Sequence, residues 1–173
     1  MDYSLFLHPR NADASIDRQG LLVELEAIGF LHTEPSSSSI RPGPKLMEYI
    51  TYLGCSPALS SGGAEASVRL HAYDRPAWLG GEAIDRLRFP GCGHAITSGA
   101  ALIEQGAPWQ CPECGNHGDL ASIGWRRSAA RARLFIEISP IFPREAVPSD
   151  ALLDRLQQVS GQPWRWFYSR SCL

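Results

Sequence analysis

Two short motifs constrain this chain more than any other feature, because each places metal-ligand side chains in a tight turn. The first contains Cys92 and His94 with one glycine between them; the second contains Cys111 and Cys114, spaced Cys-Pro-Glu-Cys and followed by Gly115. Structural zinc sites usually take their four sulfur or nitrogen ligands as two short pairs. A glycine after the second cysteine supplies the positive φ that such a turn needs. The spacing therefore predicts a Zn²⁺ site with Cys92, His94, Cys111 and Cys114 as ligands.

The fourth ligand has alternatives, and its identity decides whether the metal is structural. Other sulfur and nitrogen side chains that would replace His94 are Cys55, His71 and His117. A site with four protein ligands has no open position for water or substrate, so it stabilises a fold. The closed site predicts a protein that is not an enzyme. If His94 is not a ligand, the alternative is a zinc hydrolase with Glu113 or Glu104 as the nearest candidate base.

The cysteine content and the first residues bear on the cellular compartment. The chain has five cysteines, and its start lacks the basic residues and long apolar stretch of a signal peptide. No apolar run approaches the roughly 20 residues of a membrane span. These features predict a cytoplasmic protein that does not enter a membrane. In that compartment cysteines bind metal more often than they form disulfides.

Hydrophobic periodicity predicts one α+β domain over residues 1–173. Alternating patterns predict strands, and these cover residues 3–8, 46–53, 67–73, 134–138 and 164–168. Helical spacing predicts two amphipathic helices, over 15–29 and 149–160. Asp13 or Ser15 is expected to cap the first helix, and Ser149 the second. Residues 35–44, rich in serine and proline, are expected to form a flexible loop.

The order of these elements gives the expected architecture. A strand, a helix, a strand and one further strand precede the motifs, and a second strand–helix–strand group follows them. Two such halves suggest a ferredoxin-like α+β sandwich with an inserted zinc-ribbon-like module over residues 85–125. The alternative is a zinc ribbon covered by unrelated strands and helices.

The pattern Cys-x-His-x16-Cys-x2-Cys, followed by Gly115 and Gly118-Asp119, resembles the zinc ribbon of bacterial DNA primases. That family has two residues between its first Cys and His, whereas only Gly93 lies there in this chain. The resemblance covers about 30 residues and none of the primase catalytic domain. It implies nucleic-acid binding, in which Trp109 and Trp125 would stack on bases. A nearby basic cluster would contact phosphates, and its members are Arg126, Arg127, Arg131 and Arg133.

A broader resemblance connects the chain to uncharacterised bacterial proteins with a central zinc-ribbon-like insertion. The stretches that carry it are residues 51–57, the second cysteine motif, 133–138 and 163–168. In such proteins the first metal pair is expected to be Cys-x-x-Cys, from which Cys92 and His94 depart. The resemblance implies one continuous fold and brings no known activity with it.

The expected function follows from the closed site and from the charge. A net charge of −2 is not that of a basic domain that neutralises many phosphates. The first hypothesis is therefore a zinc-stabilised module that binds a protein partner, of the adaptor or immunity type. Nucleic-acid binding through the zinc ribbon and the arginines is the alternative. Glu137 is expected to face a polar side or a buried partner such as Arg165, with a catalytic role as the alternative.

Overall fold

The computed structural model describes residues 3–37, 39–53 and 66–170. Strands and helices share this part of the chain, which confirms the α+β class. The strands are β1 (Tyr3–Pro9), β2 (Leu31–Thr33), β3 (Ile40–Pro42), β4 (Ile50–Tyr52), β5 (Ser67–Gly80), β6 (Trp109–Gln110), β7 (His117–Gly118), β8 (Ala129–Ile141), β9 (Ala146–Pro148) and β10 (Trp164–Arg170). The helices are α1 (Arg18–Ala27), α2 (Leu46–Tyr49), α3 (Gly99–Gln105) and α4 (Asp150–Ser160).

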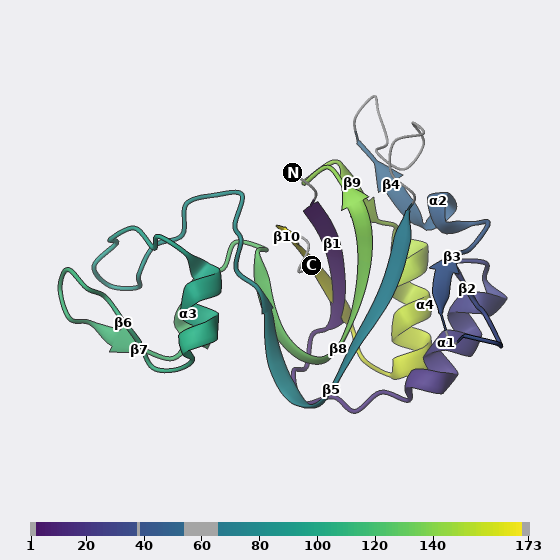
Figure 1. The fold of residues 1–173 in the computed structure, drawn as a ribbon, viewed down its shortest axis with the longest axis horizontal. Coiled ribbons are helices and arrows are strands. Elements are labelled where there is room, and N and C mark those ends of the chain that lie inside the picture. Colours follow the sequence, from purple (N-terminus) through teal and green to yellow (C-terminus); the bar gives the residue numbers. More distant parts are fainter. Residues whose placement is uncertain (1–2, 38, 54–65, 171–173) are drawn as a thin grey trace.

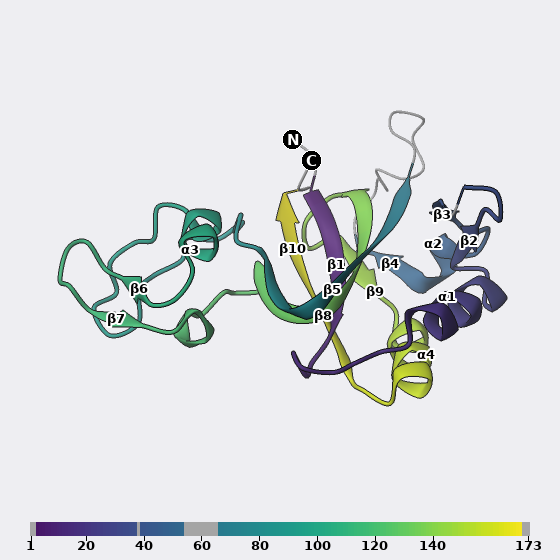
Figure 2. The same cartoon turned by 60° about the horizontal axis from the view of Figure 1, so that its bottom comes forward.

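Four long strands form the main sheet in the order β10-β1-β8-β5, and each neighbouring pair is antiparallel. Helix α1 follows β1 in the chain, and α4 lies between β8 and β10. Both helices cover the same face of the sheet (Figures 1 and 2). The remaining strands form three small two-stranded pairs, β2–β3, β4–β9 and β6–β7.

The alternation of side chains along β1 shows how the two sheet faces differ. Leu5 and Leu7 point toward the helices and join the largest apolar cluster, with leucines of α1 and α4. Phe6 points to the opposite face, where its ring stacks on Phe167 at 4.9 Å between centroids. Ser4 and His8 lie on that second face too, and both are buried. This face is therefore covered, although neither α1 nor α4 lies over it.

The cover of the second face comes from the bend of β5 and β8 (Figure 1). The register between these strands shifts between Ala72 and Ala77. Beyond the shift, Ala130 and Ala132 of β8 pack with Phe6 and Phe167, and Leu79 packs against the same cluster. The paired strands thus curl over the sheet to which they belong.

Residues 81–128 connect the bent ends of β5 and β8. The two strands still face each other at Gly80 and Ala129, so the chain leaves and rejoins the sheet at one point. Between these points lies a second apolar cluster, separate from that under the helices. Gly81, with φ of 104°, sits at the junction, where a Cβ atom would lie 2.5 Å from the Ala100 backbone nitrogen. We call residues 81–128 the connecting module.

Several local predictions are confirmed, because capping residues and alternating side chains determine these helices and strands. Helix α4 begins after Ser149, whose side chain accepts a hydrogen bond from the Leu152 N–H, and it ends at Gly161 in the left-handed conformation. Strands β1 and β10 lie where alternation predicts them, although β10 continues to Arg170. The predicted strands 67–73 and 134–138 are the centres of longer strands, β5 and β8.

Three local predictions are wrong. The predicted strand over 46–53 begins as helix α2, because Leu46 turns into the core, and only Ile50–Tyr52 is extended. Part of the predicted loop 35–44 is strand β3, which pairs with β2. Helix α1 is capped by Asp17, which accepts from the Gln19 N–H, and not by Asp13 or Ser15.

Helices in the described part of the chain are too short or too polar to cross a membrane.

Candidate metal centre

A tight loop presents the first two candidate ligands. The Phe89 N–H donates to the His94 carbonyl at 2.9 Å, and the Gly93 N–H donates back to the Phe89 carbonyl at 3.0 Å. The Arg88 guanidinium also donates to the Gly93 carbonyl, at 2.8 Å. Gly93 has φ of 73°, a conformation that other residues rarely adopt. These bonds hold Cys92 and His94 at the tip of one turn.

A second loop, between β6 and β7, presents the other two candidate ligands. The Cys111 N–H donates to the Asn116 carbonyl at 2.7 Å, and the Gly115 N–H donates to the Cys111 carbonyl at 2.9 Å. Gly115 has φ of 75°, as its place after Cys114 predicts. Two backbone bonds therefore close the turn around the second cysteine pair.

The two loops bring their four candidate ligands together. The ligand atoms of Cys92, His94, Cys111 and Cys114 all lie within 4.8 Å of one another, so they form a possible metal site. The Cys92 and Cys111 sulfurs are 3.7 Å apart. Two sulfurs about 2.3 Å from one tetrahedral ion would be about 3.8 Å apart. The Cys92–Cys111 distance is therefore close to the spacing of two sulfurs on one tetrahedral ion.

Hydrogen bonds also adjust the acidity of the thiols. Burial alone would raise the pKa of Cys111, but backbone N–H groups of Cys114 and Glu113 and the neighbouring thiols outweigh it and lower this pKa. At Cys114 a hydrogen bond from the Asn116 backbone lowers the pKa. Burial and the Cys92 and Cys111 sulfurs outweigh it, and the pKa rises. The hydrogen bonds to Cys111 thus favour its thiolate, the form of cysteine that binds a metal.

Two tryptophan side chains support the cysteine loops through a ring contact and indole hydrogen bonds. The Trp109 ring lies 5.4 Å from that of Phe89, and its indole N–H donates to the Asp119 carbonyl and to the Ser122 hydroxyl. The Trp125 indole N–H donates to the Leu120 carbonyl at 2.9 Å. Trp109 and Trp125 are only 4% and 7% exposed. The expectation that these rings stack on bases is therefore wrong, because both are buried in the core of the connecting module.

His71 and His117, two of the alternatives to His94 as the fourth ligand, lie outside the cysteine cluster. The His71 Nε2 atom lies 2.8 Å from the Glu137 carboxylate, and His71 is outside the cysteine cluster. His117 is exposed on β7 and does not belong to the cluster either. Cys55 lies outside the described residues. The proposed bases Glu113 and Glu104 are both exposed, at the loop tip and on α3.

Glu137 is fully buried in β8, and Ser4 and His71 are among its partners on the second sheet face. The Ser4 hydroxyl donates to one carboxylate oxygen at 2.6 Å, and His71 contacts the other at 2.8 Å. The carboxylate therefore separates the serine from the histidine. A serine nucleophile needs direct contact with its base, so this order is not that of a catalytic triad. Glu137 therefore has buried polar partners, as expected, and those that the structure identifies are Ser4 and His71, whereas the sequence suggested Arg165.

The four arginines of the predicted basic cluster occupy different environments. Arg126 and Arg127 lie at the end of the connecting module, both exposed and both with positive φ. The Arg127 guanidinium stacks over the Trp166 ring at 4.5 Å. Arg131 is exposed on β8, and Arg133 is half-buried there. Periodicity in the sequence did not reveal that Arg127 and Trp166 meet, because 39 positions separate them.

No protein-family model matches this chain, and searches of curated proteins and of solved structures found no match. The resemblances to the primase zinc ribbon and to uncharacterised bacterial proteins therefore stay predictions.

Proposed function

We propose that this protein is a cytoplasmic zinc-binding protein that acts by binding a protein partner, as an adaptor or immunity-type module. The observation that carries the zinc part is the convergence of Cys92, His94, Cys111 and Cys114 within 4.8 Å. Three thiolates and an imidazole in a tetrahedral arrangement suit Zn²⁺ better than Mg²⁺ or Ca²⁺, which prefer oxygen ligands. With all four positions filled by the protein, the ion is structural and the protein is not an enzyme.

The strand order supports the proposed architecture. In chain order the main strands β1, β5, β8 and β10 are first to fourth, so the spatial order is fourth, first, third, second. Helices α1 and α4 follow the first and third of them. We propose that these elements form a ferredoxin-like sandwich. Residues 85–125 would then be a zinc-ribbon-like module inserted within the hairpin formed by the second and third strands.

The surface next to the connecting module supports partner binding. Leu53 is 70% exposed and Ile84 is 41% exposed, and both line one cavity of about 350 Å³. Arg126 and Arg144 line the same cavity, and Arg144 also pairs with Asp85. Apolar side chains beside arginines are typical of protein interfaces. Burial of the module tryptophans removes the base-stacking surface that a nucleic-acid partner would use, so the protein partner is preferred.

Metal analysis of the native protein and of His94→Ala tests the zinc proposal. Elemental analysis should give one zinc per chain, and X-ray absorption should give three sulfur ligands and one nitrogen ligand. His94→Ala should lose the nitrogen, whereas His117→Ala, a neighbouring exposed histidine outside the cluster, should keep it. A protein without metal would contradict the proposal. An oxygen ligand unchanged by His94→Ala would favour the zinc hydrolase.

A further inference from the structure

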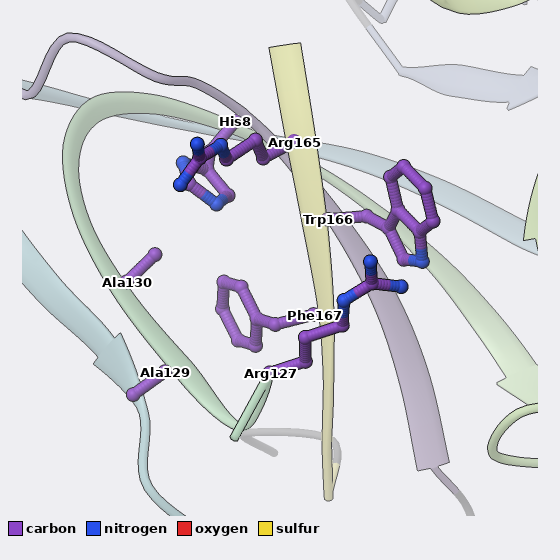
Figure 3. Close-up of a pocket in the computed structure, with 7 residues that line it drawn as sticks. All are labelled: His8, Arg127, Ala129, Ala130, Arg165, Trp166 and Phe167. Carbon is purple, nitrogen blue, oxygen red and sulfur yellow. The ribbon is translucent and has the colours of Figure 1, made fainter. Parts of the chain in front are cut away.

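A groove lies beside β10 and is also lined by His8 of β1 (Figure 3). Its volume is about 450 Å³, and the start of β8 forms its other wall. His8 and Arg165 lie side by side at one end, and Arg127 lies at the other end beside Trp166. The Phe167 ring lies between the two ends.

The backbone of β10 leaves hydrogen-bonding groups open at the outer edge of the strand, beside this groove. The Tyr168 N–H points away from β1, because it donates to the Arg127 carbonyl at 2.9 Å. Backbone groups alternate in direction along an antiparallel strand, so those of Trp166 and Trp164 point the same way. In the described part of the chain, backbone pairing with this edge ends at Arg127, so the edge at Trp166 and Trp164 is open. Open edge groups of this kind pair readily with another strand.

The charge of the groove is positive. Arg127 and Arg165 line it, and its lining contains no acidic side chain. Within the described residues, neither guanidinium has a carboxylate at ion-pair distance. The His8 Nδ1 atom lies 3.0 Å from the Pro9 carbonyl, so this nitrogen carries a proton and donates to that oxygen. Two unpaired guanidinium groups therefore face a cavity with nothing in the described chain to neutralise them.

We propose that this groove binds an extended acidic segment of a protein partner, which adds as a short strand to the edge of β10. Its backbone would pair with Trp166 and Trp164, and its carboxylates would contact Arg127 and Arg165. Strand addition combines backbone hydrogen bonds for affinity with side-chain contacts for specificity. This inference rests on the proposed function, because it specifies the chemistry of the partner.

The aromatic side chains of the groove favour a peptide over a nucleic acid. Phe167 is only 1% exposed, so its ring offers no free face for a base. The Trp166 ring is already covered by the Arg127 guanidinium. A single-stranded nucleic acid would need such faces for stacking. The open backbone groups repeat at every second residue, which matches the repeat of an extended peptide.

The test uses the zinc-loaded full chain and a fluorescein-labelled peptide of alternating glutamate and valine, followed by fluorescence anisotropy. The double variant Arg127→Glu/Arg165→Glu should weaken binding by about tenfold or more, because charge-assisted contacts become repulsive. Arg165→Glu alone, on an exposed side chain that leaves the Arg127 contacts intact, should weaken it in the same direction. The matched control is Arg18→Glu, which makes the same charge change at the start of α1, where an acidic residue suits the helix dipole.

Two further measurements locate the peptide. In ¹⁵N-labelled protein, the backbone amides of Trp164 and Trp166 should shift and exchange more slowly with solvent when the peptide binds. A peptide with lysine in place of glutamate should not bind. The proposal is overturned if the glutamate peptide does not bind, if Arg18→Glu weakens binding equally, or if single-stranded DNA binds more tightly. Shifts confined to Leu53 and Ile84 would overturn the groove proposal while leaving partner binding intact, and zinc content tests the metal site separately.

Discussion

The core under the helices and the core of the connecting module differ in size and in what completes them. The core between the sheet and its helices contains 18 buried residues, drawn from β1, β8, β10, α1 and α4 among others. The core of the connecting module contains eight, and one of these is the candidate ligand Cys111. Small cores bury too little apolar surface to offset chain entropy and usually need a metal or a disulfide. The comparison predicts that the connecting module depends on a bound metal ion for its stability more than the sheet does.

The largest effect should follow removal of the metal. Structural zinc contributes an apparent free energy of about 10–16 kcal/mol in small modules. Chelation, or Cys111→Ser, should unfold residues 81–128 while the centre of β8 keeps its structure. Hydrogen exchange followed by mass spectrometry should show protection lost from the module and retained in Leu134–Ile138.

The control for this experiment is Cys55→Ser, which changes the remaining candidate sulfur ligand. It should leave zinc content and module protection unchanged. Loss of zinc in Cys55→Ser would mean that the ligand set is wrong. Loss of protection throughout the sheet of the chelated protein would mean that the two cores are not separable.

Truncation of one isoleucine in each core should give the next largest effects. Ile136 is fully buried in the sheet core, and Ile123 is 4% exposed in the module core. Loss of three carbon atoms and the resulting cavity cost about 2–5 kcal/mol at a buried site. Ile136→Ala should lower the free energy of global unfolding by this amount. Ile123→Ala should instead raise local exchange within the zinc-loaded module and leave β8 protected.

Urea denaturation and hydrogen exchange on both variants check this prediction. Equal loss of protection in both regions from Ile123→Ala would show that the cores unfold as one unit. The pair is matched in chemistry, so a difference between the variants reports on the regions and not on the side chain removed.

What the sequence predicted well depends on residues close together in the chain. The cysteine loops are set by Gly93 and Gly115 and by backbone bonds within six residues of each other, so their spacing alone indicates the site. Helix α4 has its serine cap and its final glycine adjacent to it. In both places local bonds and packing agree, and no distant contact competes with them.

What the sequence could not predict depends on distant contacts. Leu46 begins a helical turn because the core takes its side chain, which overrides the alternation seen from 46 to 53. The length of β5 and β8 comes from their mutual pairing through Gly80 and Ala129. The groove residues His8, Arg127 and Arg165 carry no shared motif, and only the fold brings them to one edge.

The serine caps of two helices offer a comparison with a smaller effect. Ser149 caps α4 beside the large core, and Ser98 caps α3 in the connecting module, each accepting from a backbone N–H. Loss of such a cap costs about 0.5–2 kcal/mol. Ser149→Ala should therefore lower the global free energy of unfolding by roughly 1 kcal/mol, as measured by urea denaturation. Ser98→Ala should leave global unfolding unchanged and speed exchange within α3; a global effect from Ser98→Ala would contradict the separation.

The smallest effect concerns two buried polar groups, one at each core, of which one has hydrogen-bond acceptors and the other has no partner among the described residues. In the module core the Trp109 indole N–H has two acceptors, whereas the buried Tyr52 hydroxyl beside the sheet core has no partner among the described residues. An unsatisfied buried hydroxyl costs free energy, so Tyr52→Phe should be neutral or stabilising by up to about 1 kcal/mol. Trp109→Phe should destabilise the module, because it leaves the Asp119 carbonyl with one donor fewer.

The Tyr52 hydroxyl also makes the free energy of unfolding depend on pH, and the raised pKa fixes the sign of this dependence. Burial raises the pKa of Tyr52 to about 12, above the ordinary value of 10.0. The unfolded chain therefore loses this proton first as the pH rises, and the tyrosine contributes less to stability between pH 10 and about 12. Tyr52→Phe removes that loss, so its advantage over the native protein in urea denaturation should grow through this window. A constant difference would mean that Tyr52 ionises as freely in the folded chain as in the unfolded one, and that its hydroxyl is not buried without a partner.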